Sequence, residues 1–465
     1  MTIEGKNIAA EKAVSEQLAG WAAGLDVSAL PAEVRDAVSN TLIDTVGLSI
    51  AATETDYGQA VRAAADMEGG CTVFGASETR SPFDAALING TTGHGEDFDN
   101  TYEGCPVHSG VVIVPALIAA GEAYELPSER VALGMAVGIE VMCRMGLVAQ
   151  KAVHKQGFHP TSVLGTVAAA LGVGVARGQH AIQLRDTLGV SASQSSGIIE
   201  YLADGTWTKR MHPGWAAQAA IRAAAMGGAG FRGPVTMFEG VHGLYKAFAP
   251  SLGTPDFDAL TGELGTRWEA ANVAFKPYAC GTMTQPFIDC SVRLAQHNVP
   301  IEEIEEVVCY VGEGTVHRLW APLELKQSPP TPYAAKFSGP YTVAAGYVFG
   351  DAGLSEFTEA AIADPRARAM AAKTRYEIDP DDEYPRNYTG TVELRLKSGQ
   401  RLREHQAQLR GGTRQKMTRP EILSKCRANL AFASWNGADA DAIAAFADGL
   451  FNSSAPVDAG LLTRR

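Results

Sequence analysis

The segment 388–402, with the sequence YTGTVELRLKSGQRL, decides the fold class because it does not fit a helix. In its part TVELRL, residues 391–396, apolar and polar side chains alternate with a period of two, which is typical of a strand with one buried face. The residues from Leu396 to Leu402 then predict a hairpin turn. The chain therefore contains a β-hairpin near its C-terminal end.

Outward from this hairpin, a second strand is predicted at 304–311, IEEVVCYV. Before about Thr266 the pattern is helical, as in the apolar side chains that recur every four residues from Val34 to Val46. After the hairpin, the residues TRPE at 418–421 predict the cap and first turn of a helix. The expected fold class is mainly α, with a smaller α+β domain inserted before a final helical segment.

The length and net charge of the chain limit the functions that it can have. The 465 residues leave room for two or three domains, and 46% hydrophobic with 20% charged residues is a usual globular composition. The 39 Lys and Arg residues against 52 Asp and Glu residues give a net charge of −13, which makes nucleic acid an improbable partner. An anionic substrate would need a local cluster of basic groups.

Cysteine usage and apolar runs predict the compartment. The seven cysteines form an odd set without any C-x-x-C spacing, which argues against a disulfide framework and a zinc module and favours a reducing cytoplasm. Residues 1–16 lack the continuous apolar run of a signal peptide. The apolar runs at 110–121 and 163–176 are shorter than the roughly 20 residues that span a bilayer, so no membrane role is expected.

The first segment with chemical potential is HGEDFDNT at 94–101. If it ends a helix, His94, Asp97 and Thr101 share one face that could hold a substrate. An alternative is a capped helix end with Asp99 and Asn100 in solvent. A metal site is a third option, although no distal pair of ligands is evident, and no metal is expected.

Three histidines precede predicted helices. His159 and His212 each stand directly before a proline that can open a helix, and His108 precedes a third helical run. Free N–H groups at such helix starts favour anions, and Lys209 and Arg210 add positive charge. Each histidine alone is more often structural, but together with the basic pair they predict a carboxylate-binding pocket.

The segment FKPYACGTMTQPFID at 275–289 lies where the helical pattern gives way to strands. A loop at such a boundary commonly reaches into the cleft between two domains. The alternative is a linker rich in Pro and Gly.

The chain resembles the 2-methylcitrate dehydratase family, also called the MmgE/PrpD superfamily, over nearly its whole length. The resemblance depends on the segment 94–101, the three histidine-containing segments and the segment 275–289, which follow the order of the family. Residues 230–240 and 335–341 are also similar to family patterns. The resemblance implies a homodimer whose subunits each have a large helical domain and an α+β lid domain. The expected organisation is a helical domain over 1–268, the lid over 269–405, and a C-terminal segment over 406–465 that returns to the helical domain.

The resemblance also implies cofactor-independent chemistry on small di- and tricarboxylates. Family members include 2-methylcitrate dehydratases, cis-aconitate decarboxylases and iminodisuccinate epimerases, which all form or quench a carbanion beside a carboxylate. We expect a dehydratase-type lyase acting on a hydroxy-di- or tricarboxylate such as a 2-methylcitrate-like acid. The alternatives are an epimerase or racemase, a decarboxylase, and a non-catalytic protein that binds a carboxylate.

Family roles can be placed on residues of this chain that match the family motifs. The resemblance assigns catalysis to Asp97, His108, His159 and Lys209, with the two histidines as the leading acid and base candidates. Asp97 would orient a neighbour or act as a base, and Lys209 would stabilise developing negative charge. The expected substrate-binding residues are Thr101, Arg210, His212, Lys276, Tyr278 and Gln285.

The chain departs from the family pattern at several positions. Asn100 stands where Asp is usual, the spacing from Thr101 to His108 is longer by about one residue, and Gln285 replaces a family histidine. Glutamine cannot transfer a proton near neutral pH, so a reaction that needs an acid or base there must use another residue. Tyr278 and Cys280 are the nearest candidates in sequence.

Overall fold

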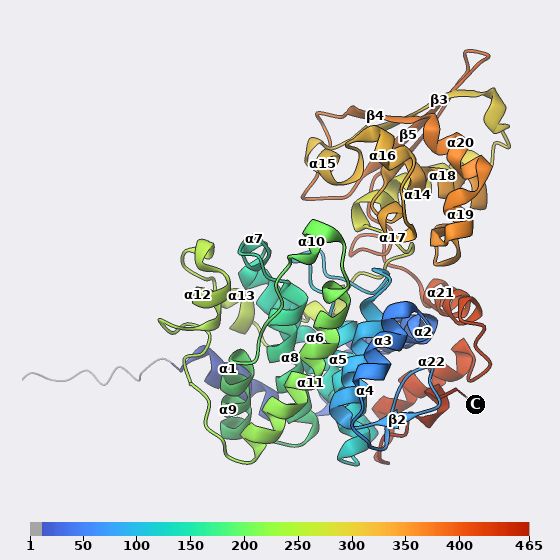
Figure 1. The fold of residues 1–465 in the computed structure, drawn as a ribbon. Helices are drawn as coiled ribbons and strands as arrows, with labels where there is room; N and C mark the ends of the chain where they lie inside the picture. The colour runs from blue at the N-terminus through green and yellow to red at the C-terminus, as the bar shows by residue number, and fades with distance from the viewer. Residues whose placement is uncertain (1–11, 465) are drawn as a thin grey trace, which may run out of the picture.

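The computed structural model describes residues 12–464 and divides into two lobes (Figure 1). The larger lobe is helical, and the smaller lobe holds a four-stranded sheet with helices beside it. This arrangement confirms the predicted fold class. The prediction that residues 1–16 do not form a signal peptide rests mostly on residues 1–11, which lie outside the described residues.

Long helices pack closely at the centre of the larger lobe. Helix α6 (Ser128–Ala149) lies against α8 (Pro160–Ala176), and α11 (Thr208–Gly228) lies against both α8 and α4 (Pro82–His94). The backbones of α6 and α8 approach so closely that a Cβ atom on Gly134 would lie 2.5 Å from the carbonyl oxygen of Gly172. The Ala- and Gly-rich pattern of α8 therefore does mark close helix packing.

Helix α6 is long and apolar enough to cross a membrane by length and composition. It is longer than the apolar runs at 110–121 and 163–176 on which the prediction of no membrane role was based. In the structure, α6 is the central helix of the larger lobe and almost all of it is buried against its neighbours. Its composition is explained by this core position.

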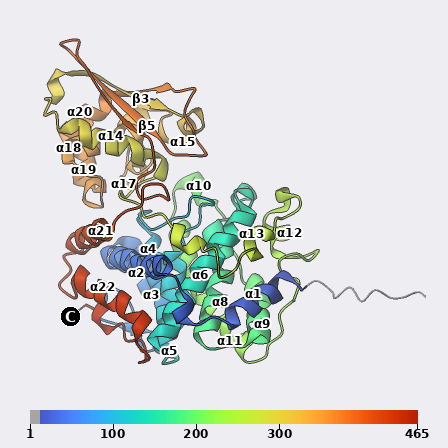
Figure 2. The same ribbon diagram turned by 180° about the vertical axis from the view of Figure 1, so that it is seen from behind.

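The C-terminal helices return to the larger lobe. Helices α21 (Arg419–Phe432) and α22 (Ala440–Gly449) pack against α2 (Ala32–Ala52), as seen from behind in Figure 2. The Nζ atom of Lys425 on α21 lies 2.7 Å from Oδ1 of Asp44 on α2 and donates a hydrogen bond to the carbonyl oxygen of Phe98. The predicted cap is confirmed, since Glu421 accepts a hydrogen bond from the backbone N–H of Thr418.

The sheet of the smaller lobe has the strand order β4-β3-β5-β6. Strands β3 (Ile304–Val311) and β4 (Thr374–Ile378) are parallel, whereas β5 (Gly390–Leu396) pairs antiparallel with β3 and with β6 (Arg401–Gln406). The predicted strand at 304–311 and the predicted hairpin are therefore confirmed. Helix α14 (Gln285–Ala295) packs on β5 and β6, and α18 (Gly339–Phe349) packs on α14 and α20 (Pro365–Ala372).

Shorter elements complete both lobes. The larger lobe also contains α1 (Val14–Ala23), α3 (Asp56–Ala64), α5 (Gly110–Ala123), α7 (Ala152–Lys155), α9 (Ala181–Ala192), α10 (Tyr201–Asp204), α12 (Leu244–Phe248), α13 (Asp258–Thr261) and the antiparallel pair β1 (Cys71–Thr72) and β2 (Thr79–Arg80). The smaller lobe adds α15 (Val316–Leu319), α16 (Leu323–Gln327), α17 (Pro332–Ala335) and α19 (Glu359–Ala363).

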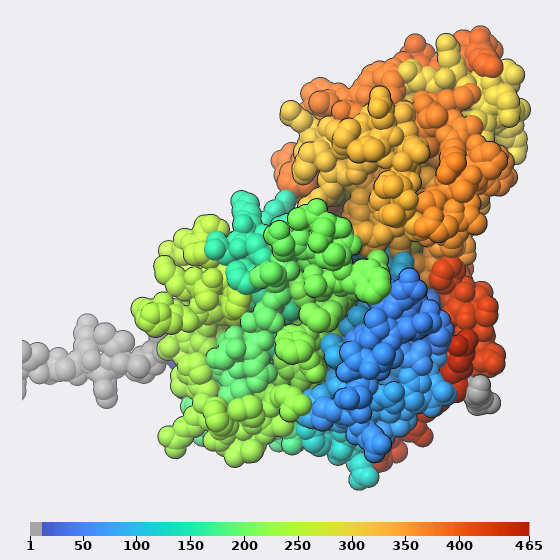
Figure 3. Space-filling model, in the orientation of Figure 1, coloured from blue at the N-terminus to red at the C-terminus, as the bar shows by residue number. Residues whose placement is uncertain are grey.

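The lobes meet along a narrow waist (Figure 3). An apolar cluster crosses it, with Leu48 and Phe98 from the larger lobe packed among residues that include Tyr278 and Ile288. The ammonium group of Lys336, just after α17, donates a hydrogen bond to the carbonyl oxygen of Glu96 at 2.7 Å. The loop after α4 therefore lies where both lobes can contribute side chains.

Candidate functional site

The loop after α4 leaves the helix abruptly. Helix α4 ends at His94, and Asp97 adopts a left-handed backbone conformation with φ of 55°. His94, Asp97 and Thr101 therefore do not share a helical face, and that conditional prediction was wrong. The alternative with Asp99 and Asn100 in solvent was also wrong, because both side chains are fully buried.

Asp97 is the centre of an ion-pair cluster between the lobes. Its Oδ1 atom lies 2.7 Å from Nζ of Lys209 in the first turn of α11 and 3.5 Å from Nζ of Lys276. Lys276 also donates a hydrogen bond to the carbonyl oxygen of Asp97 at 2.7 Å. Although burial disfavours both charged forms, the pKa of Asp97 is held well below and that of Lys209 above its ordinary value by their mutual attraction. Both groups are therefore ionised at neutral pH.

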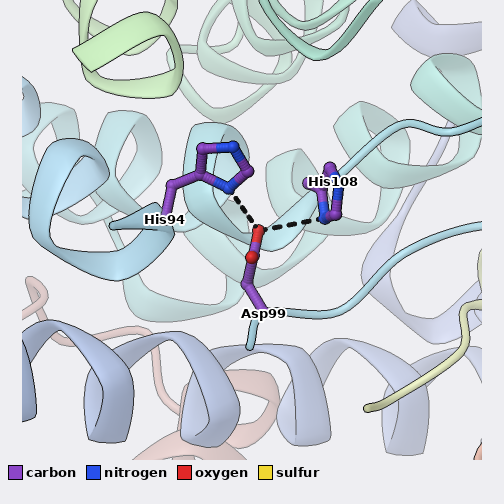
Figure 4. A group of neighbouring side chains, drawn as sticks. All are labelled: His94, Asp99 and His108. Atoms are coloured by element: carbon purple, nitrogen blue, oxygen red, sulfur yellow. Dashed lines mark hydrogen bonds and ion pairs between the residues drawn. The ribbon is translucent and has the colours of Figure 1, made fainter. Parts of the chain in front are cut away.

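Beside this cluster, Asp99 lies between two imidazoles (Figure 4). Its Oδ2 atom is 2.9 Å from Nδ1 of His94 and 3.2 Å from Nδ1 of His108. The ligand atoms of these three residues lie within 4.8 Å of one another, so by distance alone they could hold a metal ion. However, Nδ1 of His108 is also 2.9 Å from the carbonyl oxygen of Asn100, which can only accept a hydrogen bond. A hydrogen-bonded trio fits these contacts better than a metal site.

Two further histidines extend the cluster. His159 is the N-cap residue of α8, as predicted, and its ring stacks on that of His94 with centroids 5.5 Å apart. Its Nδ1 atom lies 3.2 Å from Nδ1 of His212. His212 does not stand at a helix start, because α11 begins at Thr208 and continues through Pro213, whose ring removes only one hydrogen bond of the helix. That placement of His212 was wrong.

Burial keeps most of these imidazoles neutral. It lowers the pKa of His94 and of His212 to about 4, even though Asp99 opposes the effect at His94. The pKa of His159 is also lowered well below its usual value, first by burial and then by its histidine and lysine neighbours. Neutral imidazoles are proton acceptors, so the site offers bases at neutral pH.

Two tyrosines that the sequence analysis missed complete the surroundings of Lys209. Tyr201 on α10 contacts the rings of His159 and His212, with centroid distances of 6.3 and 5.9 Å. Tyr333 comes from α17 of the smaller lobe. Burial raises the pKa of Tyr201 to about 12 and also raises that of Tyr333, so both phenols are neutral. No spacing pattern marks either residue in the sequence.

Arg210 lies between two aromatic rings rather than beside a carboxylate. Its guanidinium carbon is 4.3 Å from the ring centroid of Tyr57 and 5.0 Å from that of Tyr333. Because Tyr333 belongs to the smaller lobe, Arg210 joins the two lobes over the site. Its predicted contact with substrate stays a prediction.

The other predicted substrate-binding residues lie at the margin of the site. The Thr101 backbone pairs with Ala274, and its hydroxyl donates to the carbonyl oxygen of Val107 at 3.4 Å. Tyr278 donates its hydroxyl hydrogen to Asp289, and Gln285 donates to the carbonyl oxygen of Tyr278. Among residues 12–464, no hydrogen bond or ion pair joins Tyr278 or Gln285 to the histidines or to Lys209.

Cys280, the other sequence candidate for the missing acid or base, is fully buried. Its thiol lies 3.0 Å from the hydroxyl of Thr284, and burial raises the pKa of the thiol to about 12. Tyr201 lies beside the rings of His159 and His212, and Tyr201 and Tyr333 both interact electrostatically with Lys209, so they are better candidates than Cys280 or Tyr278 to donate a proton.

The comparisons with known proteins agree with this architecture. The model of the MmgE/PrpD N-terminal domain matches residues 16–254, and that of the MmgE/PrpD C-terminal domain matches residues 278–445. A cis-aconitate decarboxylase-like protein of Aspergillus oryzae is 25% identical over 384 residues, which cover 78% of this chain and 79% of its own. The cis-aconitate decarboxylase of Mus musculus is 26% identical, and the match covers 90% of this chain and 87% of the mouse protein. The cis-aconitate decarboxylase of Homo sapiens is 25% identical, and the match covers 91% of this chain and 89% of the human protein.

Proposed function

Because this chain belongs to the MmgE/PrpD family and is an enzyme that processes small carboxylic acids, we propose that it is a lyase that eliminates water from a hydroxy-di- or tricarboxylate. The observation that supports this most directly is that Asp97, which holds the ion-pair cluster, and Asp99, which contacts two imidazoles, lie in one short buried loop. Bases and permanent positive charges then lie within one buried site.

The first step in this proposal is proton removal beside a substrate carboxylate. Such a step places a second negative charge on that carboxylate group, so preorganised positive charges stabilise the transition state by several kcal/mol. Lys209 and Lys276 supply those charges, with Asp97 holding both ammonium groups in place. His108 and His159 are the proposed bases. The side chain of His108 is 10% exposed, whereas those of His94 and Asp99 are fully buried, so of these three His108 can be reached by substrate.

The second step is departure of the hydroxyl group, which needs a proton. The phenols of Tyr201 and Tyr333 are neutral and interact electrostatically with Lys209, so they are the proposed acids. Tyr201 belongs to the larger lobe and Tyr333 to the smaller one. If Tyr333 is the acid, the smaller lobe supplies the proton while the larger lobe supplies the base.

Decarboxylation is the second candidate, favoured by the names of the relatives that match this chain. Loss of carbon dioxide also leaves a carbanion beside a carboxylate, so the same lysines would stabilise it. The tyrosines would then protonate carbon instead of oxygen. The two reactions share the lysines and the acid, but only dehydration needs a base to remove a proton, because decarboxylation forms the carbanion by breaking a carbon–carbon bond.

Proton NMR of the enzyme in D₂O with a panel of substrates tests the proposal. The panel contains 2-methylcitrate, citrate, cis-aconitate, tartrate and an amino-dicarboxylate, and both product signals and deuterium incorporation are recorded. Alkene signals that grow from a hydroxy acid support dehydration, namely a vinyl hydrogen or, where the new double bond carries no hydrogen as in one product of 2-methylcitrate, an allylic methyl singlet. Loss of carbon dioxide from cis-aconitate would instead establish the decarboxylase, and deuterium exchange without net elimination would establish an epimerase or racemase.

A further inference from the structure

Asp99 contacts two histidines, and among residues 12–464 it forms no ion pair with a lysine or arginine. Its side chain is fully buried, and its Oδ2 atom faces Nδ1 of His94 and Nδ1 of His108 (Figure 4). Both lysines of the site instead contact Asp97. The two carboxylates of one short loop therefore serve different partners.

The contacts of His108 determine where its hydrogen lies. Nδ1 of His108 is 3.2 Å from the Asp99 carboxylate and 2.9 Å from the carbonyl oxygen of Asn100. Both oxygens can only accept hydrogen bonds, so Nδ1 must be the protonated nitrogen. In a neutral imidazole the other nitrogen, Nε2, then carries the lone pair.

The same argument applies to His94, whose Nδ1 atom lies 2.9 Å from Asp99. Its Nε2 atom is buried without a hydrogen-bond partner among the described residues, as is Oδ1 of Asp99. The two histidines differ in access, because only His108 has exposed surface. One carboxylate thus orients an accessible imidazole and a buried one.

We propose that Asp99 is a positioning residue that holds His108 with Nδ1 protonated, so that Nε2 is the atom that accepts a proton from substrate. The role of Nε2 as the proton acceptor rests on the proposed function. The tautomer of His108 does not depend on that function. His94 supplies the second N–H donor that a buried carboxylate needs. Asp97, the closest acidic residue in the sequence, does not perform this task.

The decisive measurement is the tautomer of His108 in the full chain, read by long-range ¹H–¹⁵N NMR of the histidine side chains, with His108→Asn used to assign the signal. Wild-type protein should show His108 protonated on Nδ1. In Asp99→Asn only the carbonyl oxygen of Asn100 still accepts from Nδ1, so the fraction of His108 protonated on Nδ1 should fall and a signal from the Nε2-protonated tautomer should appear. Asp186→Asn, which alters a buried carboxylate on α9 that pairs with Arg185, should leave the signal unchanged.

Kinetic measurements distinguish a positioning role of Asp99 from a purely structural role. Loss of an orienting carboxylate in a histidine-based site lowers kcat by about 10⁴-fold in the best-studied example of this arrangement. We expect Asp99→Asn to lower kcat by on the order of 10²- to 10⁴-fold, with KM changed only a few-fold, on whichever substrate the panel identifies.

Three results would overturn the inference. These are a wild-type His108 protonated on Nε2, an Asp99→Asn variant with unchanged tautomer and kcat, and a stoichiometric divalent metal that leaves with a chelator and with Asp99→Asn. If Asp99→Asn does not fold, the wild-type spectrum alone decides the question. Because the spectrum requires no substrate, a correct tautomer without turnover would count against the proposed reaction and not against the role of Asp99.

Discussion

Nζ of Lys209 lies 2.7 Å from Oδ1 of Asp97, and this ion pair joins the first turn of α11 to the loop after α4. Lys276, from the segment that leads into the smaller lobe, contacts the same carboxylate. The positive charges of the site are therefore held by one aspartate before any substrate arrives. Such preorganisation is what stabilisation of a developing carbanion requires.

Lys209→Met should lower kcat/KM by about a hundredfold or more, because one preorganised cation is lost from the transition state. Steady-state kinetics on the identified substrate measure this. Lys373→Met is the matched control, since Lys373 donates its hydrogen bonds to backbone carbonyls at the sheet of the smaller lobe. Near-normal turnover in Lys209→Met would remove this residue from the mechanism.

Tyr333→Phe and Tyr201→Phe test the proposed acids. Loss of a general acid typically costs about 10²- to 10⁴-fold in rate, so at least one of the two variants should lose about a hundredfold in kcat. Tyr347→Phe serves as the control, because that hydroxyl donates to the carbonyl oxygen of Val299 within the smaller lobe. If both Phe variants keep kcat within tenfold of wild type, neither phenol is the acid.

Stability should fall as the pH is lowered from about 6.5 towards 4. The pKa values of His94 and His212 are about 4 in the folded protein, below the ordinary value of about 6.5 that applies to the unfolded chain. In this window the unfolded state binds more protons than the folded state. Each of the two histidines therefore lowers the free energy of unfolding by about 2 kcal/mol at pH 5 relative to neutral pH. Urea denaturation at a series of pH values measures the slope.

A histidine replacement tests the source of that slope. His212→Gln should make stability less dependent on pH between 6.5 and 4, because one buried imidazole no longer resists protonation. His297→Gln, which replaces an exposed histidine, should keep the wild-type slope. Equal slopes for His212→Gln and wild type would show that His212 does not contribute to the pH dependence.

Lys425→Met should destabilise the protein by about 3–5 kcal/mol, because it leaves the carboxylate of Asp44 buried without its partner. Thermal or denaturant unfolding measures the loss. The exposed pair of Arg427 and Asp441 is a matched control on the same helix, and Arg427→Met should cost less than about 1 kcal/mol. The double variant Lys425→Met with Asp44→Asn should recover part of the loss, and no recovery would show that the pair is not coupled.

The sequence by itself determined the secondary structure that local patterns control. Alternation at 391–396 and the TRPE cap at 418–421 specify their elements through near neighbours, and the structure has both. His159 was also placed correctly, since a proline after it fixes the start of α8. Pro213 does not mark a helix start at His212, because α11 begins at Thr208 and continues through the proline despite the lost hydrogen bond.

Only the tertiary structure decided which groups meet. The sequence gives no sign that Asp97 pairs with two lysines while Asp99, two residues later, faces two histidines. That division depends on the left-handed turn at Asp97 and on helices contributed by distant parts of the chain. Tyr333 likewise reaches the site only because the two lobes pack together. The neutral state of Tyr201 and Tyr333 follows from burial, which no local pattern encodes.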